Sequence, residues 1–179
     1  MIVQYVDFSS KYGMGYKLSN GSYGVLFNDS TKIILDPNCF HFDYIQRPSN
    51  GNGEDFVSHL DFFTYPKEIG KKVILLQHFK SYLDGNQKFK PIEMNYTKEA
   101  PPKRTIASLN FLKKWKRAKK AILFRLSNKI IQVLFQDLSE LILCSGNGMV
   151  TFINSKKQIK KLPLTSDLEC KDPSMYKRL

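Results

Sequence analysis

The residues that could carry chemistry are scattered along the chain and form no catalytic or metal-binding set. Residues 13–15 read Gly-Met-Gly and begin like a nucleotide-binding loop, but no third glycine follows at the required place, and no lysine-terminated phosphate loop occurs. His41, His59 and His78 have no metal-binding spacing to cysteine or acidic residues, so we interpret each as a structural histidine. We therefore expect a binding module with no catalytic residue, metal or cofactor.

Positive charge is the clearest chemical signal in the sequence. The formal net charge is +12, and all of the excess lies in the second half: residues 1–100 contain 11 Lys/Arg and 11 Asp/Glu, whereas residues 101–179 contain 17 and 5. The excess is densest at residues 113–120, KKWKRAKK, and continues at Lys156, Lys157, Lys160 and Lys161. Such a surface attracts anions, whether nucleic acid, acidic lipid or phosphorylated protein; the alternative is a solvated face or a run that resembles a nuclear-import signal.

The composition predicts a folded intracellular protein. Hydrophobic residues make up 42% of the chain, which is enough for a core. No apolar stretch is long enough to span a membrane, and the first four residues lack the features of a signal peptide. The three cysteines, Cys39, Cys144 and Cys170, are odd in number and show no paired spacing, which favours reduced thiols.

One stretch of the sequence occurs twice. Residues 18–35, LSNGSYGVLFNDSTKIIL, align without a gap with residues 126–143, LSNKIIQVLFQDLSELIL, and nine of the positions are identical. We interpret the two copies as homologous modules of about 80 residues, a size at which one domain alone is marginally stable. Two such modules packed face to face would bury more surface and would form a cleft between them, where a ligand could bind.

The first module is expected to be an antiparallel meander that is closed by a helix. Asn20-Gly21 between apolar runs predicts a hairpin, and in the second copy Asn128 is expected to adopt the left-handed conformation without the glycine. Apolar residues at helical spacing predict a helix over 66–83, with Gly85 just past its end; its aromatic stripe either belongs to the core or partly lines a groove. The expected strands are residues 16–18, 23–27, 32–35, 41–46 and 55–62.

The second module repeats the strands after a linker. Residues 84–108 have no clear period and include Ala100-Pro101-Pro102, which is typical of a linker. A short closing helix is expected after Leu164, although Pro173 limits its length. The expected strands are residues 121–126, 130–136, 140–144, 149–153 and 158–162.

Several of these segments resemble the tandem polo boxes of polo-like kinases. The resemblance covers nearly the whole chain and includes residues 5–16 (YVDFSSKYGMGY), residues 24–31 (GVLFNDST), Trp115 and residues 135–137 (FQD). It implies an α+β fold of two polo boxes, each a six-stranded antiparallel sheet with a helix, packed as a β-sandwich with a cleft between them. The implied domains are polo box 1 at residues 1–83, the linker at 84–108 and polo box 2 at 109–179.

The resemblance also implies a function. Polo boxes dock a Ser/Thr kinase onto partner proteins, often at a serine followed by phosphoserine or phosphothreonine, and they restrain the kinase domain in cis. The chain would then be the non-catalytic, regulatory part of such a kinase, a monomer in the cytoplasm and nucleus that is targeted to spindle poles, centrosomes and kinetochores. Because it begins so close to the first box, we expect it to be a truncated piece of the kinase.

The family's peptide-binding residues can be carried over onto this sequence. A groove tryptophan of the family falls at Tyr5, the aromatic wall falls at Phe79 and Tyr82, and His78 stands where a tyrosine is common. The helix-end segment that supplies backbone contacts falls near Gln87 and Lys88. The resemblance therefore implies a peptide-binding set of Tyr5, Tyr12, Leu75, Phe79, Tyr82, Lys88 and Arg117.

The family's phosphate pincer is altered in this chain. Its His and Lys, which follow the Gln-Asp of the second box, are replaced by Leu138 and Glu140. Glu140 would place a like charge beside a phosphate that carries about −1.5 to −2 at neutral pH. We expect either a cleft that binds a partner segment without phosphate, or an alternative phosphate clamp built from Lys88, Lys116, Arg117 and Lys119.

A rival hypothesis from another class uses the basic residues alone. A nucleic-acid or anionic-lipid binder would use residues 113–120 together with residues 156–161, and its affinity would fall steeply with added salt. An enzyme is the third class, and no residue of the sequence supports it.

Overall fold

The computed structural model describes residues 1–48, 53–86, 88–92 and 109–164. The chain divides into two compact units, Met1–Phe111 and Leu112–Leu179, which are considered one at a time below.

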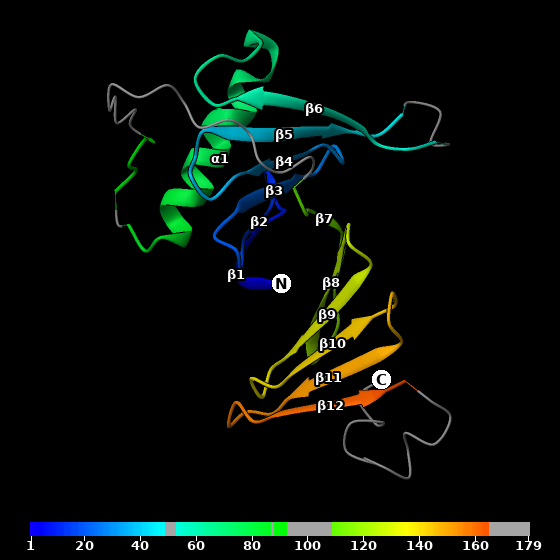
Figure 1. Cartoon of the computed structure of the whole chain (residues 1–179). Helices are drawn as coiled ribbons and strands as arrows, with labels where there is room; N and C mark the ends of the chain where they lie inside the picture. Colours follow the sequence, from blue (N-terminus) through cyan, green and yellow to red (C-terminus); the bar gives the residue numbers. More distant parts are fainter. Residues whose placement is uncertain (49–52, 87, 93–108, 165–179) are drawn as a thin grey trace. The chain divides into compact units, whose positions relative to one another are not determined.

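The first unit is a six-stranded antiparallel sheet with one helix packed against it (Figure 1). The strands follow one another in sequence order, as the meander prediction requires. A 3₁₀ turn at Lys67–Ile69 leads into helix α1, Gly70–Leu83, and Gly85 with φ of 76° ends the helix as expected. The strands are β1 (Ile2–Phe8), β2 (Gly13–Leu18), β3 (Tyr23–Phe27), β4 (Lys32–Leu35), β5 (His41–Gln46) and β6 (Phe56–Asp61).

The second unit is also a six-stranded antiparallel meander, so the predicted pair of sheets is confirmed. The helix expected after Leu164 lies outside the described residues, and the sandwich packing of the two boxes stays a prediction, as do the domain boundaries. The strands are β7 (Leu112–Arg117), β8 (Ala121–Leu126), β9 (Ile130–Phe135), β10 (Glu140–Cys144), β11 (Met149–Ile153) and β12 (Ile159–Pro163).

The first strand of each sheet was not predicted from periodicity. β1 and β7 are edge strands, and each contains a register shift near its start, between Ile2 and Gln4 in β1 and between Leu112 and Lys114 in β7. A bulge breaks the alternation of side chains that identifies a strand in a sequence. The same irregularity at the same place in both sheets is itself evidence for duplication.

The repeated sequence builds the same turn in both units. In the first copy the Phe27 N–H donates to the Thr31 carbonyl at 2.9 Å, and in the second the Phe135 N–H donates to the Ser139 carbonyl at 3.0 Å. The fourth residue is left-handed in each copy, with φ of 68° at Ser30 and 63° at Leu138.

The preceding hairpins correct one prediction. Gly21 has φ of 89°, and the left-handed residue of the second copy is Lys129, with φ of 63°, rather than Asn128. Asn128 instead accepts a hydrogen bond from the Ile130 N–H through its side chain at 3.4 Å, as Asn20 does from the Ser22 N–H at 3.2 Å. The side chain of the asparagine, and not its φ angle, is therefore what the repeat preserves.

Two His–Asp pairs join β5 to β6 on one face of the first sheet. His59 Nδ1 lies 2.8 Å from Asp43 Oδ1, and His41 Nδ1 lies 2.8 Å from Asp61 Oδ1. The two carboxylates differ in exposure, because the side chain of Asp43 is 1% exposed and that of Asp61 is 62% exposed. Asp43 also accepts a hydrogen bond from the N–H of Leu109, at 3.0 Å, and so fixes residues 109–111 on the first unit.

We expect these two pairs to contribute unequally to stability. Asp43→Ala would leave the Leu109 N–H and the His59 ring without their acceptor, at a cost of about 1.5–3 kcal/mol in the free energy of unfolding. The matched change Asp61→Ala removes an exposed pair and is expected to cost at most about 1 kcal/mol. Urea unfolding of both variants measures the difference, and equal losses would contradict the prediction.

Candidate functional site

Aromatic side chains gather where β1, the following turn and helix α1 meet. We call Phe8, Tyr12 and Tyr82 the aromatic surface; their exposed fractions are 39%, 45% and 59%. The ring centroids of Phe8 and Tyr82 are 5.5 Å apart in an edge-to-face arrangement, which is a favourable geometry. The Tyr12 N–H donates to the Phe8 carbonyl at 2.8 Å, which fixes the turn that carries Tyr12.

Phe79 supports the aromatic surface from below. It is 3% exposed, and its ring centroid lies 5.7 Å from that of Phe8. A Cβ added to Gly15 of β2 would stand 2.2 Å from Phe79 Cδ1, so the ring rests directly on the glycine backbone. The two interpretations of the helical stripe are therefore both partly right: Phe79 belongs to the core, Leu75 is half-buried against it, and Tyr82 is exposed.

Tyr5 does not share a face with these rings. Tyr5 is the register partner of Tyr16 on β2, whereas Val6 is the partner of Gly15, the residue against which the ring of Phe79 packs. Because side chains alternate along a strand, Tyr5 projects from the opposite face of β1. The structure thus brings Phe79 and Tyr82 together through Phe8, places Tyr12 on the turn that follows β1, and places Tyr5 on the other face of the edge strand. Phe8 could have been found from the sequence, since it lies two residues after Val6 on the same face.

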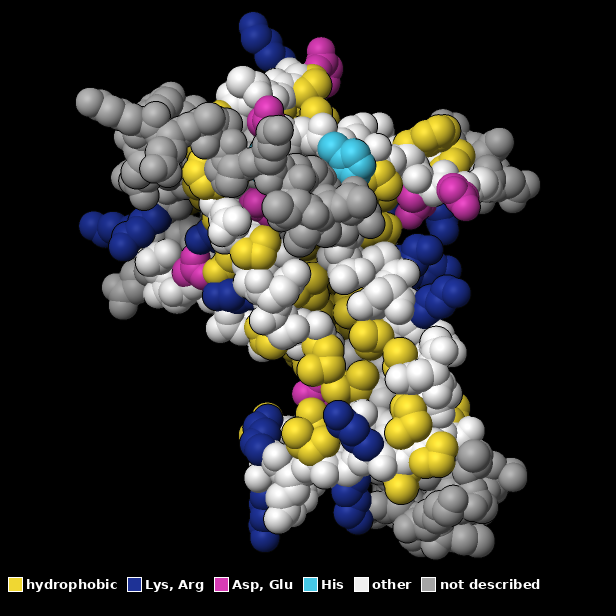
Figure 2. Space-filling view, viewed as in Figure 1, with side chains coloured by type: hydrophobic (Ala, Val, Ile, Leu, Met, Phe, Trp, Pro, Cys, Tyr) yellow, Lys and Arg dark blue, Asp and Glu magenta, His cyan; other side chains and the backbone are white. Residues whose placement is uncertain are grey.

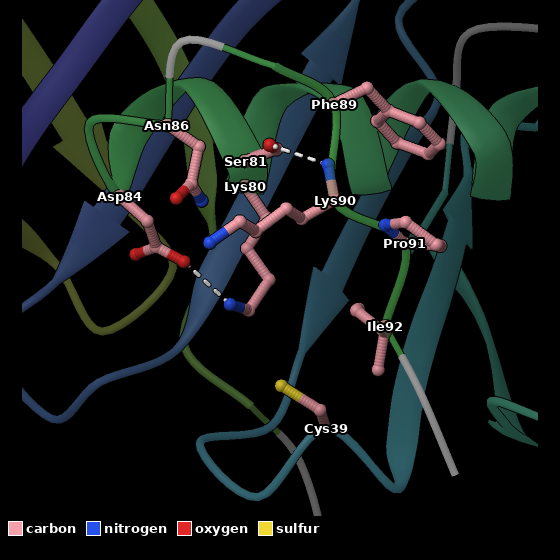
Figure 3. Close-up of a pocket in the computed structure, with 9 residues that line it drawn as sticks. All are labelled: Cys39, Lys80, Ser81, Asp84, Asn86, Phe89, Lys90, Pro91 and Ile92. Carbon is pink, nitrogen blue, oxygen red and sulfur yellow. Dashed lines mark hydrogen bonds and ion pairs between the residues drawn. The ribbon is translucent and has the colours of Figure 1, made fainter.

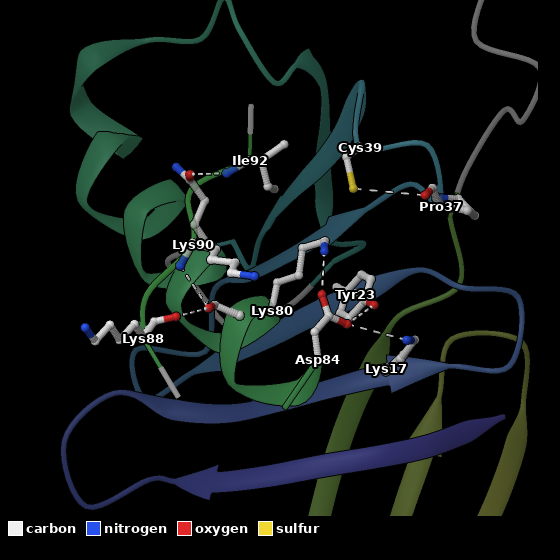
Figure 4. Close-up of polar contacts among 11 residues, drawn as sticks. Lys17, Tyr23, Pro37, Cys39, Lys80, Asp84, Lys88, Lys90 and Ile92 are labelled. Atoms are coloured by element: carbon white, nitrogen blue, oxygen red, sulfur yellow. Dashed lines mark hydrogen bonds and ion pairs between the residues drawn. The ribbon is translucent and has the colours of Figure 1, made fainter. Parts of the chain in front are cut away.

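The chain turns back along helix α1 after Gly85. Residues 88–92, which we call the return segment, are held by helix side chains: the Ser81 hydroxyl donates to the Lys88 carbonyl at 3.3 Å and accepts from the Lys90 N–H at 3.0 Å (Figure 4). Gln77 Oε1 accepts from the Ile92 N–H at 3.1 Å. Lys88, a predicted site residue, is therefore fixed through its backbone; Gln87 lies outside the described residues.

His78 also holds the return segment. Its ring stacks on that of Phe89, with centroids 4.0 Å apart and planes inclined by 25°. His78, where the resemblance implies a tyrosine, thus contacts the return segment, and this contact was not predicted.

An ion cluster surrounds the end of helix α1. Asp84 accepts a hydrogen bond from Lys80 at 2.6 Å and one from the Tyr23 hydroxyl at 2.5 Å, and Lys17 lies 3.6 Å away (Figure 4). Burial raises the pKa of Asp84, but the hydrogen bonds from Lys80 and Tyr23 outweigh it and lower the pKa below its ordinary value. Burial lowers the pKa of Lys80, and its hydrogen bond to Asp84 outweighs that effect and raises it. Both groups are charged at neutral pH.

Leu138 and Glu140, where the resemblance implies a phosphate pincer, lie on the repeated turn of the second unit and just after it. Leu138 is 72% exposed, so its side chain contributes little to the core. Glu140 begins β10, and its Oε1 accepts a hydrogen bond from Gln132 Nε2 at 2.7 Å. Gln132 is 1% exposed, so the carboxylate of Glu140 is held by a buried amide of the neighbouring strand. The side chain at position 140 is therefore a fixed hydrogen-bond acceptor.

Basic residues lie next to this turn. The Gln136 N–H donates to the Lys120 carbonyl at 3.1 Å, and the Gln136 side chain donates to the Lys119 carbonyl at 3.2 Å. Lys116 and Arg117 precede them at the end of β7, where both are exposed. Figure 2 shows that Lys and Arg account for nearly all of the charged side chains visible over β8–β12.

The predicted site residues fall in both units. Tyr5, Tyr12, Leu75, Phe79, Tyr82 and Lys88 belong to the first, and Arg117, Leu138 and Glu140 to the second. Binding of a peptide between the units therefore stays a prediction. In the described part of the chain no helix is long and apolar enough to cross a bilayer, and no three metal-binding side chains cluster.

A family model of the "POLO box duplicated region" matches residues 10–73 and 118–179, which is more than half of the chain. The chain belongs to the polo-box family. The two matched ranges fall on the two sheets, so each sheet is one polo box.

The relatives are protein kinases. A probable serine/threonine-protein kinase of Zea mays, CCRP1, is 46% identical over 156 residues, which cover 87% of this chain and 24% of that protein. The serine/threonine-protein kinase PLK1 of Xenopus laevis is 36% identical over 172 residues, which cover 94% of this chain and 27% of that protein. The chain thus spans about a quarter of the length of these curated relatives.

A solved structure has the same fold. The polo-box domain of budding yeast Cdc5, crystallised with an Spc72 phosphopeptide, superposes with a TM-score of 0.76 at 23% identity, over 99% of this chain and 66% of that one. At this level of identity the likeness shows the fold of the polo boxes.

We expect Gly15→Ala to disturb the first polo box and its aromatic surface together. The added methyl would overlap the ring of Phe79, and overpacking of this kind typically costs about 1–3 kcal/mol of unfolding free energy. The control is Gly146→Ala, where an added Cβ meets nothing within 4 Å. Thermal unfolding compares the variants, and a Gly15→Ala protein as stable as the control would contradict the packing described here.

Proposed function

We propose that this chain is the non-catalytic docking module of a polo-like Ser/Thr kinase. It binds an extended segment of a partner protein, with little or no dependence on phosphorylation. Membership of the polo-box family and the Spc72 phosphopeptide in the crystals of the Cdc5 domain support peptide binding. The kinase domain in cis, the monomeric state and targeting to spindle poles and kinetochores are parts of the same proposal.

The aromatic surface and the edge of β1 supply the contacts in the first box. β1 is an edge strand, and a peptide that lies along such an edge can reach side chains on both of its faces. Tyr5 projects on one face and Phe8 on the other, so this geometry accounts for the separation of Tyr5 from Phe79 and Tyr82. Exposed aromatic residues are also the side chains that most often carry binding energy at interfaces.

The hydrogen bond between Gln132 and Glu140 is the main support for the proposal that binding depends little on phosphorylation. A phosphate near this position would meet the carboxylate of Glu140, which the amide of Gln132 holds in place through a hydrogen bond of 2.7 Å. Leu138 offers an exposed apolar side chain where the resemblance implies a histidine. An apolar or uncharged partner residue suits this pair better than a phosphate does.

A pair of matched peptides tests the proposal. We expect a ten-residue peptide that contains Ser-Thr and its phosphothreonine form to bind the chain with dissociation constants within about threefold, because no charged hydrogen bond to the phosphate, worth about 1.5–3 kcal/mol, is formed. Fluorescence anisotropy measures both. A tenfold or greater preference for the phosphorylated peptide would instead support the alternative clamp of Lys88, Lys116, Arg117 and Lys119.

The double variant Leu138→His/Glu140→Lys should create phosphate dependence. One charged hydrogen bond of the size above corresponds to a preference of about tenfold or more for the phosphorylated peptide. Glu68→Lys makes the same change of charge in the first box and should leave the ratio unchanged. Tyr82→Ala should weaken both peptides about tenfold, whereas Ile74→Ala, at an exposed position two turns earlier on α1, should not.

The basic strand β7 favours a second candidate function, the binding of nucleic acid or anionic lipid. The side chains of Lys113, Lys114 and Lys116 are exposed, and none of them forms an ion pair with a residue that the structure describes. Counterion release would make such binding fall steeply between low and physiological salt. A salt titration with a single-stranded oligonucleotide separates this candidate from peptide docking, which should change little.

A further inference from the structure

A pocket opens on the side of helix α1 that faces away from the aromatic surface. It has a volume of about 620 Å³ and lies entirely within the first polo box (Figure 3). Lys80, Ser81 and Asp84 line it from the helix, and Cys39 lines it from the turn between β4 and β5. Asn86 and the return segment from Phe89 onward complete the wall.

The wall of this pocket is held in place by the polypeptide itself. Ser81 is 5% exposed and bonds two backbone groups of the return segment, and Gln77 bonds a third. The stack of Phe89 on His78 adds a side-chain contact. A preorganised wall loses little conformational entropy when a ligand binds, which is a property of true binding sites.

The charge around the pocket is positive. Among the lining residues, Lys80 and Lys90 contribute two positive charges and Asp84 one negative charge; just outside the lining, Lys17 lies beside Asp84 and the charge of Asp36 acts on Cys39. The carboxylate of Asp84 already contacts Lys80, Tyr23 and Lys17, so these neighbours largely neutralise its negative charge. The low pKa of Asp84 and the raised pKa of Lys80 keep this balance at neutral pH.

Two hydrogen-bond donors in the pocket have no partner among the described residues. The ammonium group of Lys90 and the side-chain amide of Asn86 make no hydrogen bond or ion pair with any described residue. In Figure 3 both side chains project toward the same space as Lys80. Pro91, Ile92 and Cys39 supply apolar surface beside them.

We propose that this pocket binds an acidic side chain, Asp or Glu, of an extended partner segment, with the carboxylate at Lys90, Lys80 and Asn86. The apolar wall of Cys39, Pro91 and Ile92 takes the neighbouring residue of the same segment. The peptidic nature of the ligand rests on the proposed docking function, but the pocket is separate from the aromatic surface. Ser81 links the pocket to Lys88, because its hydroxyl bonds the backbone of both Lys88 and Lys90.

The tetrapeptide acetyl-Ala-Leu-Glu-Ala-amide and its Gln counterpart are the probes, titrated into the isotope-labelled chain by NMR. We expect the Glu peptide to shift the backbone amides of Asn86, Phe89 and Ile92 in a saturable way, and the Gln peptide to bind at least about fivefold more weakly, since it lacks the charge. Equal binding of both peptides, or shifts elsewhere only, would overturn the proposal.

Variants separate this pocket from the rest of the box. Lys90→Glu keeps the backbone N–H that bonds Ser81 and is expected to weaken the Glu peptide about tenfold. Lys71→Glu, exposed at the start of the same helix, is the matched control and should have no effect. Inorganic phosphate that displaced the peptide at equal concentration would overturn the proposal, because it would show a site for any small anion.

The outcome is also distinguishable from the proposed function. Tyr82→Ala should leave the binding of the tetrapeptide unchanged, because Tyr82 does not line the pocket. If Lys90→Glu has no effect while Tyr82→Ala still weakens the longer docking peptide, the pocket is refuted and the docking function stands. If Tyr82→Ala abolishes tetrapeptide binding, the probe binds the aromatic surface and the pocket proposal fails.

Discussion

The close contact between Phe79 and Gly15 fixes the first polo box. It sets how near helix α1 approaches the sheet, because any side chain at Gly15 would overlap the ring. Phe8 then packs on Phe79, and Tyr82 packs on Phe8, which forms the aromatic surface. The dense packing of protein interiors makes such a contact intolerant of change, so one glycine helps to position the exposed rings of Phe8 and Tyr82.

The position of helix α1 on the sheet also determines which residues lie on its other side. With Phe79 directed at the sheet, helical spacing turns Gln77, Ser81 and Asp84 away from the aromatic surface, where they bind the return segment and the ion cluster. One helix therefore presents an aromatic face and a charged pocket at once. Ser81 bonds both Lys88 and Lys90, so the proposed ligand of the pocket and a docking peptide that reached Lys88 would contact the same short segment.

Much of the fold could be predicted from the sequence, and the failures have physical causes. Ten strands and the helix followed from alternation, turn residues and the repeat, whereas β1 and β7 were missed because bulges interrupt their alternation. At the site, residue types indicated the aromatic positions but not their faces, so Tyr5 was grouped with Phe79 until the register separated them. The return segment depends on side-chain to backbone bonds at Ser81, which no periodicity reveals.

The duplicated turn has different surroundings in the two boxes. In the first copy, Lys72 of α1 bonds Asp29 and Thr31, so the turn is tied to the helix. In both copies the aspartate also accepts a hydrogen bond within the turn, from Thr31 to Asp29 and from Ser139 to Asp137. The residue between them is left-handed in each, Ser30 in the first copy and the exposed Leu138 in the second. Because Ser30 and Leu138 share this conformation, the turn itself requires it, and what is particular to the second copy is an exposed apolar side chain, which contact with a partner, the role proposed for it beside Glu140, would cover.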